Sequence, residues 1–313
     1  MRKTTGVAIA GMLAILLAAC TSPGAAPISA TPSVAPSVEP SVAPSEAVAT
    51  PGACAKDSLT LVTAGTFTIG TDNPAYPPYF LENTDGSKTA PWELGDPTNA
   101  TGFESAVGYA MADQLGFSRE EVTWVVVPFA NAFARGPKTF DIDLNQVTDT
   151  PERRQTVDLT KGYYFGRQSL VAMEGTPIAA VSSTSSLKDY TFGAQVGTTS
   201  LDAINTIIQP TKAAQVYDTN DAAIQALGQG TIDGVVVDLP TADYITNVQL
   251  DGSTIVGQFK GGTPEHFSAV LAKGSSLTPC VEAAIDVLIN EGTLEALASQ
   301  FLPFQDAVPV FGP

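Results

Sequence analysis

Histidine, cysteine and basic residues are scarce in this chain, and each scarcity excludes a class of site. The 313 residues include one histidine, three cysteines, and 15 lysines and arginines against 32 acidic residues. A single histidine nearly excludes histidine-based metal centres and histidine-dependent catalytic triads, so we expect neither a metal nor a cofactor. The formal net charge of −17 leaves no basic stripe that could bind nucleic acid or lie on an anionic membrane.

The N-terminus has the pattern of a bacterial export signal. Arg2 and Lys3 precede an apolar stretch over residues 7–17, which is well short of the ~20 residues that a spanning helix needs. The end of residues 1–20, Leu-Ala-Ala-Cys, resembles a lipobox, which implies that Cys20 is lipidated and becomes the mature N-terminus. An ordinary signal peptide with an incidental cysteine is the alternative. We expect an exported protein, anchored by lipid on the outer face of the cytoplasmic membrane or on the periplasmic side of a membrane.

Residues 21–53 differ in composition from the rest of the chain. They repeat Pro-Ser-Val, contain no aromatic residue and carry two charges. Such a segment buries too little apolar surface to offset the entropy of ordering it. We expect a disordered Pro/Ser/Ala-rich stalk that tethers the folded part.

The other two cysteines predict a disulfide. Once Cys20 is set aside, Cys54 and Cys280 form an even pair in an oxidising compartment. A bond between them would join the start of the folded part to its C-terminal segment. Two buried free thiols are the alternative.

Apolar patterning after the stalk indicates an α/β fold. Short apolar runs predict strands over residues 67–72, 122–129, 141–147, 169–173, 191–196, 233–237 and 268–272. The run at 122–129 is nearly continuous, as in a buried strand. Helical spacing recurs over residues 104–115, 200–208, 220–227, 241–248 and 280–301. The alternation of strands and helices predicts open, largely parallel sheets.

A weak internal repeat suggests two similar α/β units. Residues 131–144 and 223–238 each contain a helical segment, a glycine, and a strand that begins with aspartate. Ligands of such sheets bind beyond the carboxyl ends of the strands. The polar residues at those ends are therefore candidate binding residues.

Several short segments, taken in order, resemble one family of binding proteins. The matching segments are residues 70–72, 76–79, 102–104, 150–153, 162–164, 196–200 and 233–238. Together they resemble the family-3 solute-binding proteins of polar amino-acid ABC importers. The resemblance implies a two-lobed, type II periplasmic-binding-protein-like fold with a central cleft. Lobe 1 would comprise residues 54–166 plus 268–313, and lobe 2 residues 167–267. It further implies a monomer that delivers an amino acid to ABC permease subunits in the membrane.

Arg153 is the leading candidate for binding a ligand carboxylate. Residues 150–151, Thr-Pro, have the pattern of a helix start, which places Arg153 where the helix dipole disfavours a cation unless an anion joins it. The resemblance implies that this anion is the α-carboxylate of the ligand, with Thr148 as a second contact. A surface arginine paired with Asp149 or Glu152 is the alternative.

The second lobe is expected to supply the opposite charge. The resemblance implies that Asp238 pairs with the ligand's α-ammonium, whereas Asp233, which starts the same strand, reads as structural. The turn at Thr198, Thr199 and Ser200 resembles a further carboxylate contact, because N–H groups at a helix start attract anions. A plain capped turn is the alternative.

The remaining candidates are expected around the ligand side chain. Tyr76 and Phe129 resemble aromatic walls, with simple core packing as the alternative. Asp72 follows the first predicted strand and favours a polar or cationic ligand side chain. Amides stand at three further candidate positions where relatives carry other residue types: Asn145, Gln146 and Gln195.

These candidates indicate a binding protein and not an enzyme. A zwitterion held between Arg153 and Asp238 would stabilise a closed form of the two lobes. The chain would cross between lobes near residues 163–167 and 263–267, where His266 reads as hinge packing.

Two other functions stay open at this point. One is a lyase or dehydratase on the same scaffold, for which Glu104 and Asp143 are the acid–base candidates. The other is a sensor or receptor lipoprotein that binds its ligand without transport.

Overall fold

The computed structural model describes residues 54–260, 265–302 and 307–313. The predicted signal peptide, the lipidation of Cys20 and the stalk at 21–53 lie outside the described residues, as do residues 263–264 of the second expected crossing. Within the described ranges, the helices lack the combined length and apolar character that crossing a membrane would require.

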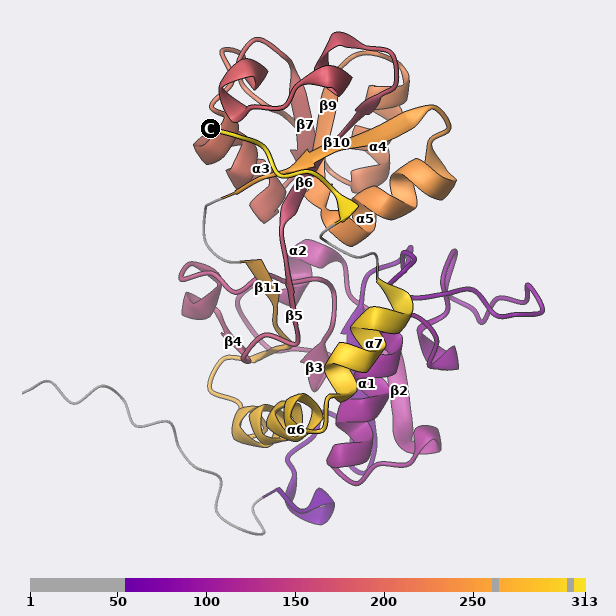
Figure 1. Ribbon diagram of the computed structural model, residues 1–313. Helices are drawn as coiled ribbons and strands as arrows, with labels where there is room; N and C mark the ends of the chain where they lie inside the picture. The colour runs from indigo at the N-terminus through magenta and orange to yellow at the C-terminus, as the bar shows by residue number, and fades with distance from the viewer. Residues whose placement is uncertain (1–53, 261–264, 303–306) are drawn as a thin grey trace, which may run out of the picture. The chain divides into compact units, whose positions relative to one another are not determined.

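The first sheet has five strands in the order β2-β1-β3-β12-β4 (Figure 1). Its strands are β1 (Phe67–Thr71), β2 (Val122–Val126), β3 (Ile142–Asp143), β4 (Val157–Leu159) and β12 (Val270–Ala272). Its helices are α1 (Phe103–Gln114), α2 (Phe129–Ala132), α6 (Thr278–Asn290) and α7 (Thr293–Phe301). β1 pairs in parallel with both β2 and β3, so all five of its residues are buried. Phe67 of β1, Met111 of α1 and Ile285 of α6 share one apolar core.

The second sheet has the order β10-β6-β9-β7-β8. Its strands are β6 (Gln168–Met173), β7 (Phe192–Gln195), β8 (Gln215–Tyr217), β9 (Gly234–Asp238) and β10 (Ser253–Gln258). Its helices are α3 (Thr199–Ala203), α4 (Asn220–Gly228) and α5 (Leu239–Tyr244), and π-helical turns at Ile204–Ile208 and Ile245–Gln249 extend α3 and α5. Leu170 and Val236 pack into one core, and Val171 and Val235 into another, because successive side chains of a strand point to opposite faces.

A two-stranded antiparallel ladder joins the segments that pass between the two sheets. It pairs β5 (Tyr164–Gly166) with β11 (Glu265–Phe267), and Figure 1 shows the two strands side by side. His266 packs against Phe165 with ring centroids 5.6 Å apart, and its Nε2 lies 3.3 Å from an Asp149 carboxylate oxygen. The histidine therefore has a packing role in this ladder.

The expectation of largely parallel sheets was wrong, because both sheets are mixed. β12 pairs antiparallel with β3 and β4, and β6 pairs antiparallel with β9 and β10. β6 follows β5 almost directly and β12 follows β11 in the same way. Neither strand is reached through the helical crossover that a parallel neighbour needs.

Three predicted elements have different limits in the structure. The apolar run at 122–129 forms an edge strand, β2, which ends at Val126 with 39% of that side chain exposed. The strand predicted at 141–147 is confined to β3, because the chain leaves the sheet and Gln146 turns with φ 51°. The helix predicted at 280–301 is two helices, separated at Gly292 with φ 72°.

The C-terminal residues pack against the second sheet, although they were expected in the first lobe. Phe311 is buried in the core that contains Leu170, with its ring centroid 5.0 Å from that of Phe259. The Phe311 N–H donates to the carbonyl of Gln258 in β10. A side chain at Gly257 would approach the Phe311 ring to 3.0 Å, so the glycine makes room for this contact. The local sequence carries no signal for such a long-range packing choice.

The predicted disulfide is confirmed. Cys54 and Cys280 are bonded across a sequence separation of 226 residues, with Cα atoms 5.3 Å apart. Cys280 lies in the first turn of α6, so the bond fixes the start of the described chain to this C-terminal helix.

Candidate functional site

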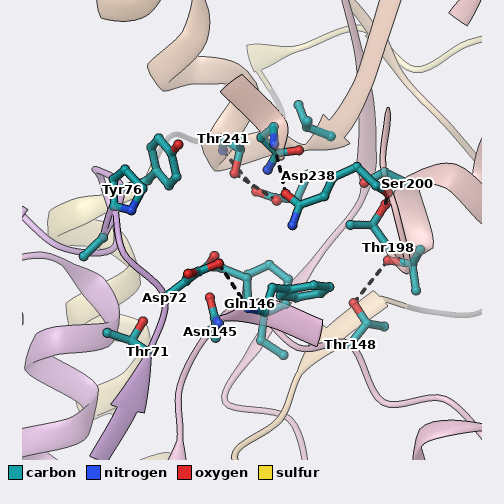
Figure 2. A pocket seen from close by; sticks show the side chains of 18 of the residues that line it. Thr71, Asp72, Tyr76, Asn145, Gln146, Thr148, Thr198, Ser200, Asp238 and Thr241 are labelled. Atoms are coloured by element: carbon teal, nitrogen blue, oxygen red, sulfur yellow. Dashed lines mark hydrogen bonds between the residues drawn. The ribbon is translucent and has the colours of Figure 1, made fainter. Parts of the chain in front are cut away.

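A single pocket collects every residue that the sequence predicts to contact a ligand. They are Asp72, Tyr76, Phe129, Asn145, Gln146, Thr148, Arg153, Gln195, Thr198, Thr199, Ser200 and Asp238. Figure 2 shows Asp72, Asn145 and Gln146 on one side of the pocket, and Asp238 and Thr241 on the other. The two sides come from segments that follow strands of different sheets.

Asp72 follows β1 directly and is held by backbone groups. Its carboxylate accepts hydrogen bonds from the N–H of Asn73 at 2.7 Å and from the N–H of Phe129, at the start of α2, at 3.1 Å. Burial raises the pKa of this carboxyl, although the two backbone donors oppose that effect. These bonds orient an acid toward the pocket and place the Phe129 ring beside it.

Gln146 adopts its left-handed backbone through contacts with Glu104. The carboxylate of Glu104 accepts hydrogen bonds from the Gln146 N–H at 2.8 Å, from its side-chain amide, and from the Tyr163 hydroxyl. Burial raises the pKa of Glu104 to about 7, while these three donors lower it. Glu104 itself does not line the pocket, so its place is beneath Gln146 and not against a bound molecule.

Arg153 is buried, and its guanidinium is oriented by carbonyls and aromatic rings. Its Nη1 donates to the carbonyl of Thr148 at 2.6 Å, and its Nη2 donates to the carbonyl of Gly197 at 2.9 Å. The guanidinium carbon lies 4.5 Å from the ring centroid of Phe133 and 5.5 Å from that of Phe129. Burial lowers the pKa of Arg153 to about 10. This value is still well above neutral pH, so the side chain stays cationic.

The alternative that Arg153 is a surface residue paired with a neighbouring acid was wrong, and Arg154 forms such a pair instead. Arg154 is the residue that pairs with Asp149, through two hydrogen bonds of 2.6 Å. The helix expected after Thr150 is a short 3₁₀ turn at Arg153–Gln155, although the Thr150 hydroxyl does accept from the Arg153 N–H at 3.2 Å. So short a turn has a small dipole, and the aromatic rings and carbonyls hold the cation instead.

Asp238 caps the start of α5 on the opposite side of the pocket. Its carboxylate accepts from the Thr241 N–H at 3.0 Å, from the Thr241 hydroxyl at 2.9 Å and from the Tyr79 hydroxyl. Burial raises its pKa. Asp233 is exposed at the other end of β9 and accepts from the Thr191 N–H at 2.7 Å, in agreement with the structural role expected for it.

The turn at Thr198 is both a helix cap and a pocket wall. The Thr198 hydroxyl accepts from the Leu201 N–H at 3.2 Å, so α3 begins with an ordinary cap. The next residue, Thr199, places its hydroxyl 3.4 Å from that of Thr148. Gln195 lines the pocket, but its side-chain oxygen accepts from the N–H of Asn220 at the start of α4.

Several lining residues were missed by the sequence reasoning. They are Thr71, Pro74, Ala75, Phe80, Gln168, Asn220, Val237, Thr241 and Phe267. Gln168 is the informative case, because it is a buried amide at the start of the apolar run of β6, and it donates to Glu265 at 2.6 Å. An amide at the start of a strand that continues into the apolar residues 170–173 was the signal available for it.

Few charged side chains line the pocket, and acidic ones outnumber basic ones. Among the described residues that line the pocket, the charged side chains are Asp72, Asp238 and Arg153. Asp143 lies outside the lining in β3, and burial holds its pKa well above the usual range. Within the described part of the chain, no three histidine, cysteine or acidic side chains gather as a metal site would require.

Comparisons with known proteins agree with this architecture. The family model for bacterial extracellular solute-binding proteins, family 3, matches residues 68–304. The L-cystine-binding protein TcyJ of Escherichia coli (strain K12) is 26% identical over 243 residues, which cover 76% of this chain and 82% of that protein. The L-arginine-binding protein of Pseudomonas aeruginosa is 26% identical over 275 residues, covering 82% of this chain and 96% of that protein.

A solved structure shows the same fold. An ancestral arginine-binding protein bound to arginine superposes with a TM-score of 0.62 at 24% identity, covering 76% of this chain and 99% of that chain. The likeness identifies the two mixed sheets as a periplasmic-binding-protein fold of type II. We call the part built on the first sheet lobe 1 and the part built on the second sheet lobe 2.

Proposed function

Because the chain belongs to family 3 of the bacterial extracellular solute-binding proteins, we propose that it binds a polar or cationic amino acid between its lobes and delivers it to the permease of an ABC importer. The observation that carries this proposal is the placement of Arg153 and Asp238. These opposite charges line one pocket and come from different lobes.

The carboxylate of the amino acid would bind at Arg153. Its guanidinium is already oriented within lobe 1 by the Thr148 carbonyl and two aromatic rings, so little side-chain entropy is lost when an anion binds. A carboxylate suits the planar fork of N–H groups. Thr199 and Ser200 add N–H groups of the first turn of α3, which have no acceptor within the helix.

The ammonium group would bind at Asp238. Three hydrogen bonds to its carboxylate fix the direction of the remaining lone pairs, and a cation placed there would offset the cost of burying the charge. Arg153 and Asp238 together neutralise a zwitterion. Asp72 is then left over, and it supports a ligand side chain that is cationic or donates hydrogen bonds.

Binding would favour closure, because the two charged groups of one small molecule are contacted by different lobes. A ligand shifts such an equilibrium by its differential affinity for the closed form. Closure also excludes water and strengthens the charge-assisted hydrogen bonds. The closed surface is what a permease would recognise.

The enzyme alternative has less support from the geometry. Glu104 and Asp143, its acid–base candidates, do not line the pocket. Both oxygens of Glu104 are held by Gln146 and Tyr163. An acid in that position orients the pocket and does not reach a reacting atom.

Calorimetry with the common amino acids and cystine tests the proposal. At least one zwitterion should bind, and Arg153→Ala should abolish the heat of binding while leaving the fold intact. Arg154→Ala is the matched control, because that neighbouring side chain pairs with Asp149 outside the pocket. Equal binding by wild type and Arg153→Ala would remove the arginine from the site.

We further propose that lipid on Cys20 holds the mature protein on the outer side of the membrane. The supports are the lipobox-like sequence at residues 17–20 and an extracellular family. Labelling cells with a radioactive fatty acid should mark the wild-type chain and not Cys20→Ser. Equal labelling of both would place any lipid elsewhere.

A further inference from the structure

Tyr79 links the two sides of the pocket although it is not one of its lining residues. Its side chain is fully buried in the core of lobe 1, with 0% of its surface exposed. Its hydroxyl donates a hydrogen bond to the carboxylate of Asp238 in lobe 2, 159 positions later in the chain. A second contact at 3.5 Å joins the same hydroxyl to that of Thr241.

The lobe 1 end of this link is held in place by backbone contacts. The carbonyl of Tyr79 accepts from the N–H groups of Glu104 at 3.0 Å and Ser105 at 3.3 Å, in the first turn of α1. A side chain at Gly102 would approach that carbonyl to 2.5 Å, so only glycine allows this close packing. The Tyr79 ring meets the Phe267 ring edge to face, with centroids 6.1 Å apart.

The lobe 2 end is equally constrained. Asp238 is the residue before α5, and its carboxylate is held by the N–H and hydroxyl of Thr241. With both ends fixed, the bond from Tyr79 to Asp238 forms only when the lobes lie at their present separation. Hydrogen bonds to a charged acceptor are roughly twice as strong as those between neutral groups.

We propose that Tyr79 is a positioning residue that latches the lobes in the closed form and aims the Asp238 carboxylate into the pocket. The latching half is a property of the protein without ligand. The aiming half rests on the proposed function, because it assumes that Asp238 receives an ammonium group. The apolar surroundings of Tyr79 do not explain its hydroxyl, because a phenylalanine would pack there equally well.

The latch is tested on the ligand-free protein by a distance measurement between the lobes. Cysteines introduced at two exposed positions, Asp113 in α1 and Asp251 after α5, carry spin labels. Double electron–electron resonance then measures the distance between the labels. Cys20→Ser in the full chain keeps the two labels unique, since Cys54 and Cys280 are bonded. Tyr79→Phe should lower the ratio of closed to open molecules by about tenfold, the effect of losing one hydrogen bond to a charged group.

Tyr109→Phe is the matched control. Its hydroxyl donates within lobe 1, to the carbonyl of Thr98 at 3.0 Å, and none of its described contacts is with lobe 2. This variant should keep the wild-type distance distribution. A Tyr79→Phe distribution that superimposes on that of the wild type would overturn the latch.

A double-mutant cycle tests whether the effect of Tyr79→Phe comes from this bond or from a general loss of stability. Asp238→Asn removes the charged acceptor from the opposite lobe, so its effect on the closed-to-open ratio should not add to that of Tyr79→Phe. Additive effects would show that the two side chains act independently and would contradict the proposal. If Tyr79→Phe fails to fold, Asp238→Asn alone tests the same bond.

Kinetics with L-arginine as the probe separate this inference from the proposed function. If L-arginine binds, Tyr79→Phe should raise its dissociation rate about tenfold and leave its association rate unchanged, because the bond forms on closure. An unchanged dissociation rate would overturn the aiming half. Failure of the wild type to bind any amino acid would sink the proposed function and with it the aiming half, while the distance measurement would still decide the latch.

Discussion

The carboxylate of Glu104 accepts a hydrogen bond of 2.8 Å from the backbone N–H of Gln146, although the two residues are 42 positions apart. The same carboxylate accepts from the Tyr163 hydroxyl, next to the strand ladder that joins the two lobes. One buried acid therefore connects the start of α1, a pocket residue and the residue before β5. Its protonation state should therefore affect the stability of the fold.

Glu104 should make stability depend on pH. Its pKa of about 7 in the folded protein lies above the ordinary 4.5, so between these values the folded state binds more protons than the unfolded state. The protonated Glu104 therefore contributes to the free energy of unfolding. This contribution is fully present below about pH 4.5 and is lost as pH rises toward 7, by up to ~1.4 kcal/mol per pH unit.

Urea unfolding of the wild type and Glu104→Gln at pH 5, 6, 7 and 8 measures this effect. The wild type minus variant difference should fall between pH 5 and 7 and then level off, because glutamine does not titrate. The other buried acids are common to both proteins and cancel in the difference. A constant difference across this range would show that Glu104 titrates normally.

Asp238→Asn should weaken amino-acid binding by tenfold or more. In the proposed function the change removes the negative charge that would face the ligand ammonium, and hydrogen bonds to a charged group contribute about 1.5–3 kcal/mol. Asp233→Asn is the control, since Asp233 lies at the other end of β9 and bonds only Thr191 among the contacts described. Calorimetry should show near wild-type affinity for the control; equal losses in both variants would contradict a local role for Asp238.

Asp72→Asn should lower selectivity for cationic side chains. The variant keeps one oxygen that can accept from the Asn73 or Phe129 N–H. It loses the negative charge of the pocket that Arg153 and Asp238 leave free for a ligand side chain. We expect the affinity for L-arginine relative to L-glutamine to fall about tenfold, measured by competition. Asp57→Asn changes the net charge equally at an exposed site outside the pocket and should leave this ratio as it is. A ratio unaffected by Asp72→Asn would place the ligand side chain elsewhere.

Removing the disulfide should destabilise the fold without altering the pocket. The bond between Cys54 and Cys280 closes a loop across 226 positions, and loops of this size restrict the unfolded chain strongly. We expect the Cys54→Ser, Cys280→Ser protein to lose about 3–5 kcal/mol in urea unfolding. Reduced wild type should behave like the variant, and ligand affinity should be unchanged below the unfolding transition. A loss under about 1 kcal/mol would show that α6 packing alone secures this end of the chain.

Local sequence patterns predicted most elements, and together with the family resemblance they identified residues that line one pocket. The apolar runs of β6 and β9 and the spacing of α1 and α4 mark elements whose contacts are largely set by burial. Asp72 and Asp238 were found because each ends or follows a strand, where polar side chains cannot serve the core. The edge position of β2 could not be predicted, because an apolar run has the same appearance whether one neighbour or two pair with it.

The sequence by itself determined which segments bury apolar surface, which cysteines are available to pair and which charges stand at strand ends, since these depend on residue type and near neighbours. Only the tertiary structure decided that Arg153 and Asp238 line the same pocket, that Phe311 packs on lobe 2, and that the hydroxyl of Tyr79 reaches Asp238. Those relationships join residues far apart in the chain. They depend on how two complete cores pack and meet, which no local pattern encodes.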